Sequence, residues 1–229
     1  MPIGIGTSPA LVKNEGNATT AQFSPPANSL LVASVTAFSD LATPSLSSGG
    51  GLTWTRRIQR ATGDDYYNEI WTAPAAGGAT NITATYTINS SFPFAAIKVD
   101  VVSGALLAAP AGQSGTGATT TNNATVNGYT SSMGGSRGFI SALCPGTTVA
   151  PTSTDDESAW PDDNGGAGLM ARKAANTPSS GTVVTFNLDA AGTGAVDWRW
   201  AALEILPFDE GRAVSILQTL TAVHHAATW

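Results

Sequence analysis

The chain has 229 residues, of which only 11% are charged, and it carries a formal net charge of −6 with a pI of about 4.7. Ordinary soluble domains contain about 25% charged residues, so this surface is polar but carries little charge. Neutral hydroxyl surfaces lose little solvation on burial, which suits proteins that pack against identical neighbours. The negative balance and the scattered basic residues argue against binding to nucleic acid and against docking on a membrane of anionic lipid.

A membrane span and Sec export are not expected either. No stretch approaches the roughly 20 apolar residues of a spanning helix, and residues 1–10 lack the charged and apolar regions of a signal peptide. The length suits one all-β domain. The single cysteine, Cys144, excludes an internal disulfide, and its apolar neighbours predict a small buried side chain.

The first half of the chain predicts a series of strands. Residues 29–38 place Leu31, Ala33 and Val35 in alternation with other side chains, which predicts a strand with one buried face. Turn residues bound each further strand, and these are expected at 52–58, 66–73, 80–88 and 94–102.

The second half begins with a passage rich in Gly, Ser, Thr and Asn over residues 104–135, which predicts a long crossover with at most short strands such as 124–129. Strands resume at 137–144, 168–174, 182–188 and 198–206. About ten strands at this spacing predict an antiparallel, jelly-roll-like β-sandwich over residues 1–207, with no helix before residue 210.

An internal echo accompanies this pattern. Residues 69–104 and 170–206 both predict a strand, a Pro or Gly turn, a Thr-rich strand and an Ala-rich strand. Duplication explains the echo, and so do two halves of one sandwich.

The C-terminal extension, residues 208–229, differs from the rest. Its apolar run 213–223 suits a short helix or a strand, and we favour the strand. An exposed apolar segment docks on a partner or on its own domain, so we expect an assembly or docking segment.

The sequence offers no catalytic residue and no cofactor-binding motif. The adjacent His224 and His225 lack further metal ligands at suitable spacing. Residues 134–138 match the G-x-S-x-G pattern of hydrolases, but a strand is predicted after Ser136 where the motif requires a helix. Phosphate-cradling and dinucleotide motifs are missing from the sequence. We therefore expect a protein that is not an enzyme, and a hydrolase remains the alternative that rests on Ser136 alone.

An acidic loop over residues 155–164 is the first candidate ligand site. Its oxygen donors, among them Asp155, Asp156, Asp162 and Asp163, would suffice for calcium, although the EF-hand pattern is missing. A solvated loop is the expectation, with a metal site as the alternative. Trp160 beside these carboxylates suits stacking on a sugar ring.

A second candidate of the same type follows Asp64 and Asp65. Tyr66 and Tyr67 come directly after these carboxylates and would supply the aromatic rings. Together with Trp160 they are the candidate ligand-binding residues.

Several short segments resemble β-sandwich domains of bacteriophage virion proteins and bacterial surface proteins. The segments that carry the resemblance are residues 29–35, 51–55, 69–73, 82–86, 99–105 and 200–206. The resemblance covers roughly residues 17–207 and carries no catalytic residue. It implies a jelly-roll-like sandwich displayed on a particle or a cell.

These observations lead to one expected function and one alternative. We expect a structural protein of a bacteriophage virion, either a capsid decoration or a tail-associated protein, assembled in the host cytoplasm. Its partners would be other virion proteins and further copies of itself. The alternative is an extracellular or cell-surface carbohydrate-binding or host-adhesion module, which needs an exposed aromatic platform for a host-surface glycan.

Overall fold

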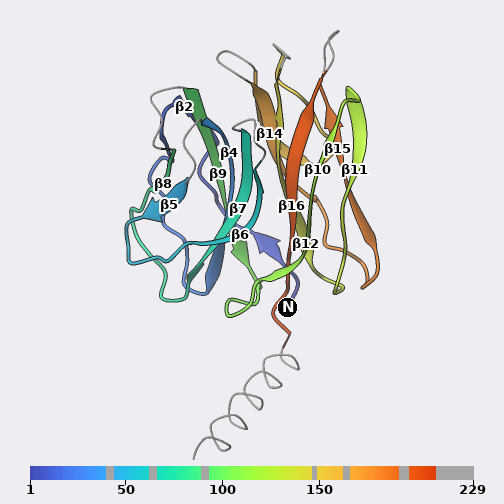
Figure 1. Ribbon diagram of the computed structural model, residues 1–229. Coiled ribbons are helices and arrows are strands. Elements are labelled where there is room, and N and C mark those ends of the chain that lie inside the picture. The colour runs from blue at the N-terminus through green and yellow to red at the C-terminus, as the bar shows by residue number, and fades with distance from the viewer. Residues whose placement is uncertain are drawn as a thin grey trace, which may run out of the picture.

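The computed structural model describes residues 1–39, 44–61, 66–88, 93–145, 149–161, 166–190 and 196–209, and every helix or strand element in these ranges is a strand (Figure 1). The predicted antiparallel all-β class is confirmed. The strands are β1 (Gly4–Ile5), β2 (Val12–Glu15), β3 (Ala18–Thr19), β4 (Ser29–Ser39), β5 (Ser45–Ser48), β6 (Thr55–Ala61), β7 (Tyr66–Ala75), β8 (Ala84–Thr87), β9 (Pro93–Ser103), β10 (Ala111–Thr119), β11 (Asn123–Thr130), β12 (Arg137–Cys144), β13 (Asp156–Trp160), β14 (Ala167–Arg172), β15 (Val183–Asp189) and β16 (Trp198–Ile205).

These sixteen strands, against the ten expected, form four sheets stacked as layers (Figure 1). The first inner sheet has the order β9-β4-β7-β6, and β1 and β2 both pair with the outer side of β9. The first outer sheet is β3-β8-β5. The second inner sheet is β10-β16-β12-β14-β13, and the second outer sheet is the pair β11-β15. Each inner sheet and its outer sheet make one sandwich, so residues 1–207 hold two sandwiches where one was expected.

Apolar side chains fill all three spaces between the layers. Leu31 and Tyr86 pack within the first sandwich, and Ile140 and Phe186 pack within the second. Residues of both inner sheets meet in the two clusters between the sandwiches, one of which joins Leu30, Val32 and Ile70 to Phe139, Leu203 and Ile205. The inner sheets are therefore covered on both faces.

The strand β4 shows the consequence of this double cover. The sequence predicted one buried face, but residues 31–37 are all buried, including Ser34 and Thr36. The Thr36 hydroxyl donates to Asn68 Oδ1 at 3.2 Å and lies 2.8 Å from Ser141 Oγ on the other inner sheet. Such bonds allow polar residues to be buried, and they make the second buried face look like a solvent face in the sequence.

The two sandwiches share one topology. In chain order, β10, β11, β12, β13, β14, β15 and β16 occupy the places of β2, β3, β4, β6, β7, β8 and β9. The echo between residues 69–104 and 170–206 corresponds to β7 to β9 and β14 to β16, so it has a structural counterpart. Only β1 and β5 have no counterpart among the described strands of the second sandwich.

The strand β10 corrects the expectation of a long crossover. It pairs with β16 from Ala111 to Thr119. A side chain at Gly115 would meet the carbonyl oxygen of Gly128, and one at Gly117 would lie 2.5 Å from the Trp200 ring. Glycine is needed for this close packing, and it removes the apolar alternation by which a strand is recognised.

Candidate functional site

Two of the three candidate aromatic residues belong to the core. Trp160, at the end of β13, is only 3% exposed, and its indole N–H donates to the Gly166 carbonyl oxygen at 3.0 Å. Tyr67 in β7 is 7% exposed. Neighbouring strands cover both rings, so neither presents the exposed face on which a sugar ring would stack.

The third candidate, Tyr66, lies where the two sandwiches meet. Its half-buried ring stacks on Phe38 with the ring centroids 4.5 Å apart, and the Arg199 guanidinium lies 4.5 Å above it. Tyr66 and Trp160 pack on the same apolar cluster. The structure thus brings the regions of Tyr66 and Trp160 together at the junction between the two sandwiches. The Tyr66 ring is already in contact there with Phe38 and Arg199. Sequence reasoning missed Phe38 and Arg199 because neither has a local signal.

The acidic candidates are paired with basic side chains. Residues 156–160 form an edge strand of the second inner sheet where a solvated loop was expected. The Asp155 carboxylate lies 2.5 Å from Lys173 Nζ, and Asp156 lies 3.5 Å from Arg172. Asp162 and Asp163 lie outside the described residues, as do Asp64 and Asp65. Within the described ranges, no three His, Cys, Asp or Glu side chains are arranged to hold a metal.

The G-x-S-x-G segment leads into β12, as the predicted strand required. Ser136 is buried, and its hydroxyl donates to the Met133 carbonyl oxygen at 2.8 Å. The next residue, Arg137, donates to the Lys173 and Ala174 carbonyl oxygens. Ser136 thus stabilises the turn from within, and Arg137 connects it to the segment after β14. His224 and His225 lie outside the described residues.

A buried carboxylate that the sequence did not single out lies in the first sandwich. Glu69 in β7 is fully buried and accepts hydrogen bonds from Arg56 at 3.0 Å, from the Trp71 indole at 2.7 Å and from the Tyr86 hydroxyl at 3.0 Å. Burial raises the pKa of Glu69, although the Trp71 bond and the Arg56 charge oppose the shift. These bonds are internal, so Glu69 holds β6, β7 and β8 together.

The second sandwich contains a similar buried acid. Glu204 in β16 accepts the backbone N–H of Gln113 at 2.8 Å and both the N–H and the hydroxyl of Ser132. A side chain at Gly112 would collide with this carboxylate. Glu204 therefore connects β10 to the turn after β11. Because Glu69 and Glu204 are both buried, neither carboxyl group adds charge to a surface that already carries little.

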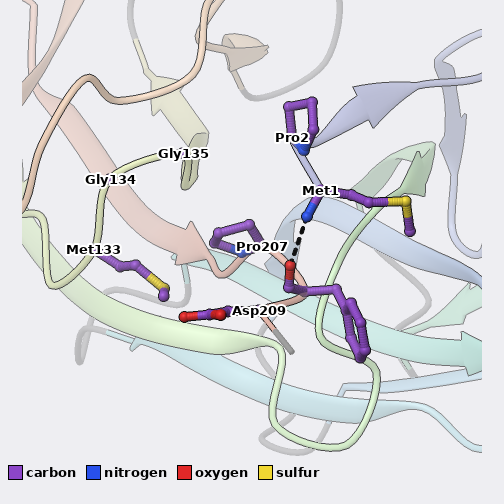
Figure 2. Close-up of a pocket in the computed structure, with 8 residues that line it drawn as sticks. Met1, Pro2, Met133, Gly134, Gly135, Pro207 and Asp209 are labelled. Atoms are coloured by element: carbon purple, nitrogen blue, oxygen red, sulfur yellow. Dashed lines mark hydrogen bonds between the residues drawn. The ribbon is translucent and has the colours of Figure 1, made fainter. Parts of the chain in front are cut away.

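An open groove lies where the two ends of the described chain meet (Figure 2). Its volume is about 520 Å³, and its lining includes Met133, Gly135, Pro207 and Asp209. The Met1 amino group donates to the Phe208 carbonyl oxygen at 2.8 Å across its wall. The C-terminal extension leaves the sandwiches at this groove, and residues 210–229 lie outside the described part of the chain.

The outer face of the second sandwich carries almost no charge. No charged residue or histidine occurs in residues 101–136 or 174–188, which include all of β10 and β11 and nearly all of β15. The outward side chains of the second outer sheet are Asn123, Thr125, Asn127, Thr130, Val183, Thr185, Asn187 and, as the one charged residue, Asp189 at the end of β15. In a chain with a net charge of −6, this neutral face is the most distinctive surface that the structure describes.

Comparison with known proteins identifies no relative: no family model, no curated protein and no solved structure matches the chain. None of the described residues forms a helix long and apolar enough to cross a bilayer.

Proposed function

We propose that this chain is a non-enzymatic structural protein of a bacteriophage virion, either a capsid decoration or a tail-associated protein, assembled in the host cytoplasm. The observation that carries the proposal is the neutral outer face of the second sandwich. Its partners are further copies of the chain and other virion proteins.

A neutral face of this kind costs little free energy to bury in an assembly. Symmetric assemblies place the same surface against itself or against an identical neighbour many times over. A charged face would lose solvation and meet its own sign at each contact, whereas hydroxyl and amide groups find hydrogen-bond partners at little cost. The burial of Glu69 and Glu204 supports the same interpretation, because it removes charge from the exterior.

The strand order supports a jelly-roll-like connectivity within the proposal. The order β2-β9-β4-β7 faces β3-β8-β5 in the first sandwich, and β10-β16-β12-β14 faces β11-β15 in the second. Jelly rolls built from two such sheets recur in viral capsid domains. This is an analogy of fold, and it adds to the surface argument without identifying a site.

The C-terminal extension completes the proposal. Asp209 lines the groove, and Met1 lies at the same groove. The apolar run 213–223 follows the last strand of the second sandwich in the sequence, which favours a role in attachment to the particle.

Mass spectrometry of purified particles tests the virion role directly. We expect peptides of this chain in stoichiometric amount in particles, and their absence from intact virions would contradict the proposal.

A variant that ends at residue 207 tests the role of the C-terminal extension. It should keep the far-ultraviolet circular dichroism of the full chain but be incorporated into particles in smaller amount. Normal incorporation of the shortened chain would overturn the role given to the extension.

A glycan array tests the alternative of a carbohydrate-binding or host-adhesion module. Because Trp160 and Tyr67 are buried and Tyr66 is covered, we expect no glycan to be retained by the full chain. A specific, saturable glycan signal would favour the alternative over a purely structural role.

A further inference from the structure

The two sandwiches differ at one edge of their outer sheets. In the first, β8 lies between β3 and β5. In the second, β15 takes the place of β8, and β11 pairs with one side of it. No described strand takes the place of β5 on the other side, which we call the open edge of β15. Among the described residues, Thr152 reaches the end of the open edge, where it exchanges two backbone hydrogen bonds with Asp189, of 2.8 and 2.9 Å.

The bonds of Asp189 show which backbone groups face the open edge. Because N–H and C=O groups of alternate residues point to the same side of a strand, Val183, Thr185 and Asn187 direct theirs to that edge as well. Among these groups, the Thr185 carbonyl oxygen accepts a hydrogen bond from Lys173 Nζ at 3.0 Å. That oxygen keeps a second lone pair for an incoming N–H.

Charge at the open edge permits contact with an identical surface. The strand β15 contains one charged residue, Asp189, at its last position, where the backbone is already paired with Thr152. The nearby Lys173 ammonium is neutralised by Asp155 at 2.5 Å. Edge strands in soluble proteins are usually blunted by charged side chains or by proline, and β15 carries neither from Val183 to Leu188. The exposed Val183 adds an apolar contact at the start of the strand.

We propose that a second copy of this chain covers the open edge. The two β15 strands pair antiparallel about a twofold axis, so that the two outer pairs join into one four-stranded sheet. The occupant is a second copy because a twofold contact sets this surface against itself, and a neutral edge is self-complementary where a charged one repels. The contact goes beyond the proposed virion role, since it forms between two copies of the purified chain.

Sedimentation velocity of the full chain over a series of concentrations tests this contact. The variant Asn187→Pro removes an N–H that faces the open edge and leaves the backbone bonds between β11 and β15 in place, since proline is tolerated at such edge positions; it also removes the side-chain bond of 3.4 Å from Asn187 to Asn123. Val183→Lys places a charge at the same edge. The matched control is Asn127→Lys, which adds the same charge to the same outer face but on β11.

We expect the wild-type chain to dimerise with rising concentration, and Asn187→Pro and Val183→Lys to raise the dissociation constant at least about tenfold. Asn127→Lys should change it by less than about twofold. Circular dichroism reports which variants are folded. If Asn187→Pro does not fold, the dissociation constant of Val183→Lys tests the proposed contact. A wild-type chain that stays monomeric overturns the proposal, as does a control variant that disrupts the dimer as strongly as the two edge variants. Particle incorporation is measured separately, so either proposal can fail alone.

Discussion

Asp100 in β9 and Arg172 in β14 form an ion pair of 2.7 Å between carboxylate oxygen and guanidinium nitrogen, across the interface between the two inner sheets. Both side chains are mostly buried, with exposed fractions of 6% and 22%. The surrounding interface is largely apolar, so the pair fixes how one sandwich is placed on the other. Burial raises the pKa of Asp100, while the Arg172 charge opposes the shift.

Breaking this pair should destabilise the protein strongly. Arg172→Met leaves the Asp100 carboxylate buried without its main partner, and we expect the free energy of unfolding to fall by about 3 kcal/mol. Urea denaturation followed by tryptophan fluorescence measures the loss. The double variant Asp100→Leu with Arg172→Met should recover most of it, because no unpaired charge remains.

The pair of Arg199 and Asp197 provides a matched control. Its distance is 2.6 Å, but the Asp197 side chain is 46% exposed. Asp197→Asn should therefore cost less than about 1 kcal/mol. Equal losses from Asp197→Asn and Arg172→Met would contradict the role of burial at the sandwich interface.

The stability of the first sandwich should depend on pH through Glu69. Its pKa is raised by burial, so the folded chain holds the proton to a higher pH than the unfolded chain does. The stabilising contribution is therefore fully present below about pH 4.3, the ordinary glutamate value, and is lost as the pH rises through the raised value.

Glu69→Gln removes this titration. Urea denaturation at a series of pH values above 4 should show a shallower fall in stability for Glu69→Gln than for the wild-type chain. Asp100 keeps its own raised pKa in both proteins, so part of the slope remains. An unchanged slope in the variant would show that Glu69 is not the titrating group.

The close approach of β10 and β11 should not tolerate a side chain at Gly115. An added methyl group meets the Gly128 carbonyl oxygen, which belongs to the backbone and cannot turn away. We expect Gly115→Ala to cost about 1 to 3 kcal/mol, the usual range for overpacking. Thermal denaturation measures the effect.

Gly77 is the control for this substitution. No atom lies within 4 Å of a methyl group added there. Gly77→Ala should thus leave the midpoint within a degree or so of the wild-type value or raise it slightly, through the lower entropy of the unfolded chain. A midpoint for Gly115→Ala as high as that of Gly77→Ala would refute the close packing.

Cys144 should act as a reporter of unfolding. The thiol is fully buried in the core of the second sandwich, and it is the single cysteine of the chain. A thiol reagent should react with it slowly in buffer and fully in denaturant, because reaction requires an exposed thiolate. Rapid labelling of the native protein would mean that this core opens readily.

Much of the strand pattern could be predicted from the sequence. The strands β4, β7, β9, β12 and β16 follow apolar runs bounded by turn residues, and such runs are local signals. We predicted a loop at the position of β13, because charged residues such as Asp156 and Glu157 are typical of a solvated loop. These two residues instead begin a strand that ends on the buried Trp160. The predicted exposure of Trp160 was wrong for the same reason.

The sequence by itself determined the all-β class, the turns, and the side chains such as Leu31 and Ile140 that are buried inside each sandwich, since alternation along a strand is a property of neighbouring residues. Only the tertiary structure decided that two sandwiches pack on each other. Thr36 and Ser141 look like solvent-facing residues until the two inner sheets meet and the hydroxyl of each finds a hydrogen-bond partner on the opposite sheet. A pattern of period two tells which residues share a face of a strand, but contacts between residues about 100 positions apart determine whether water or another sheet covers that face.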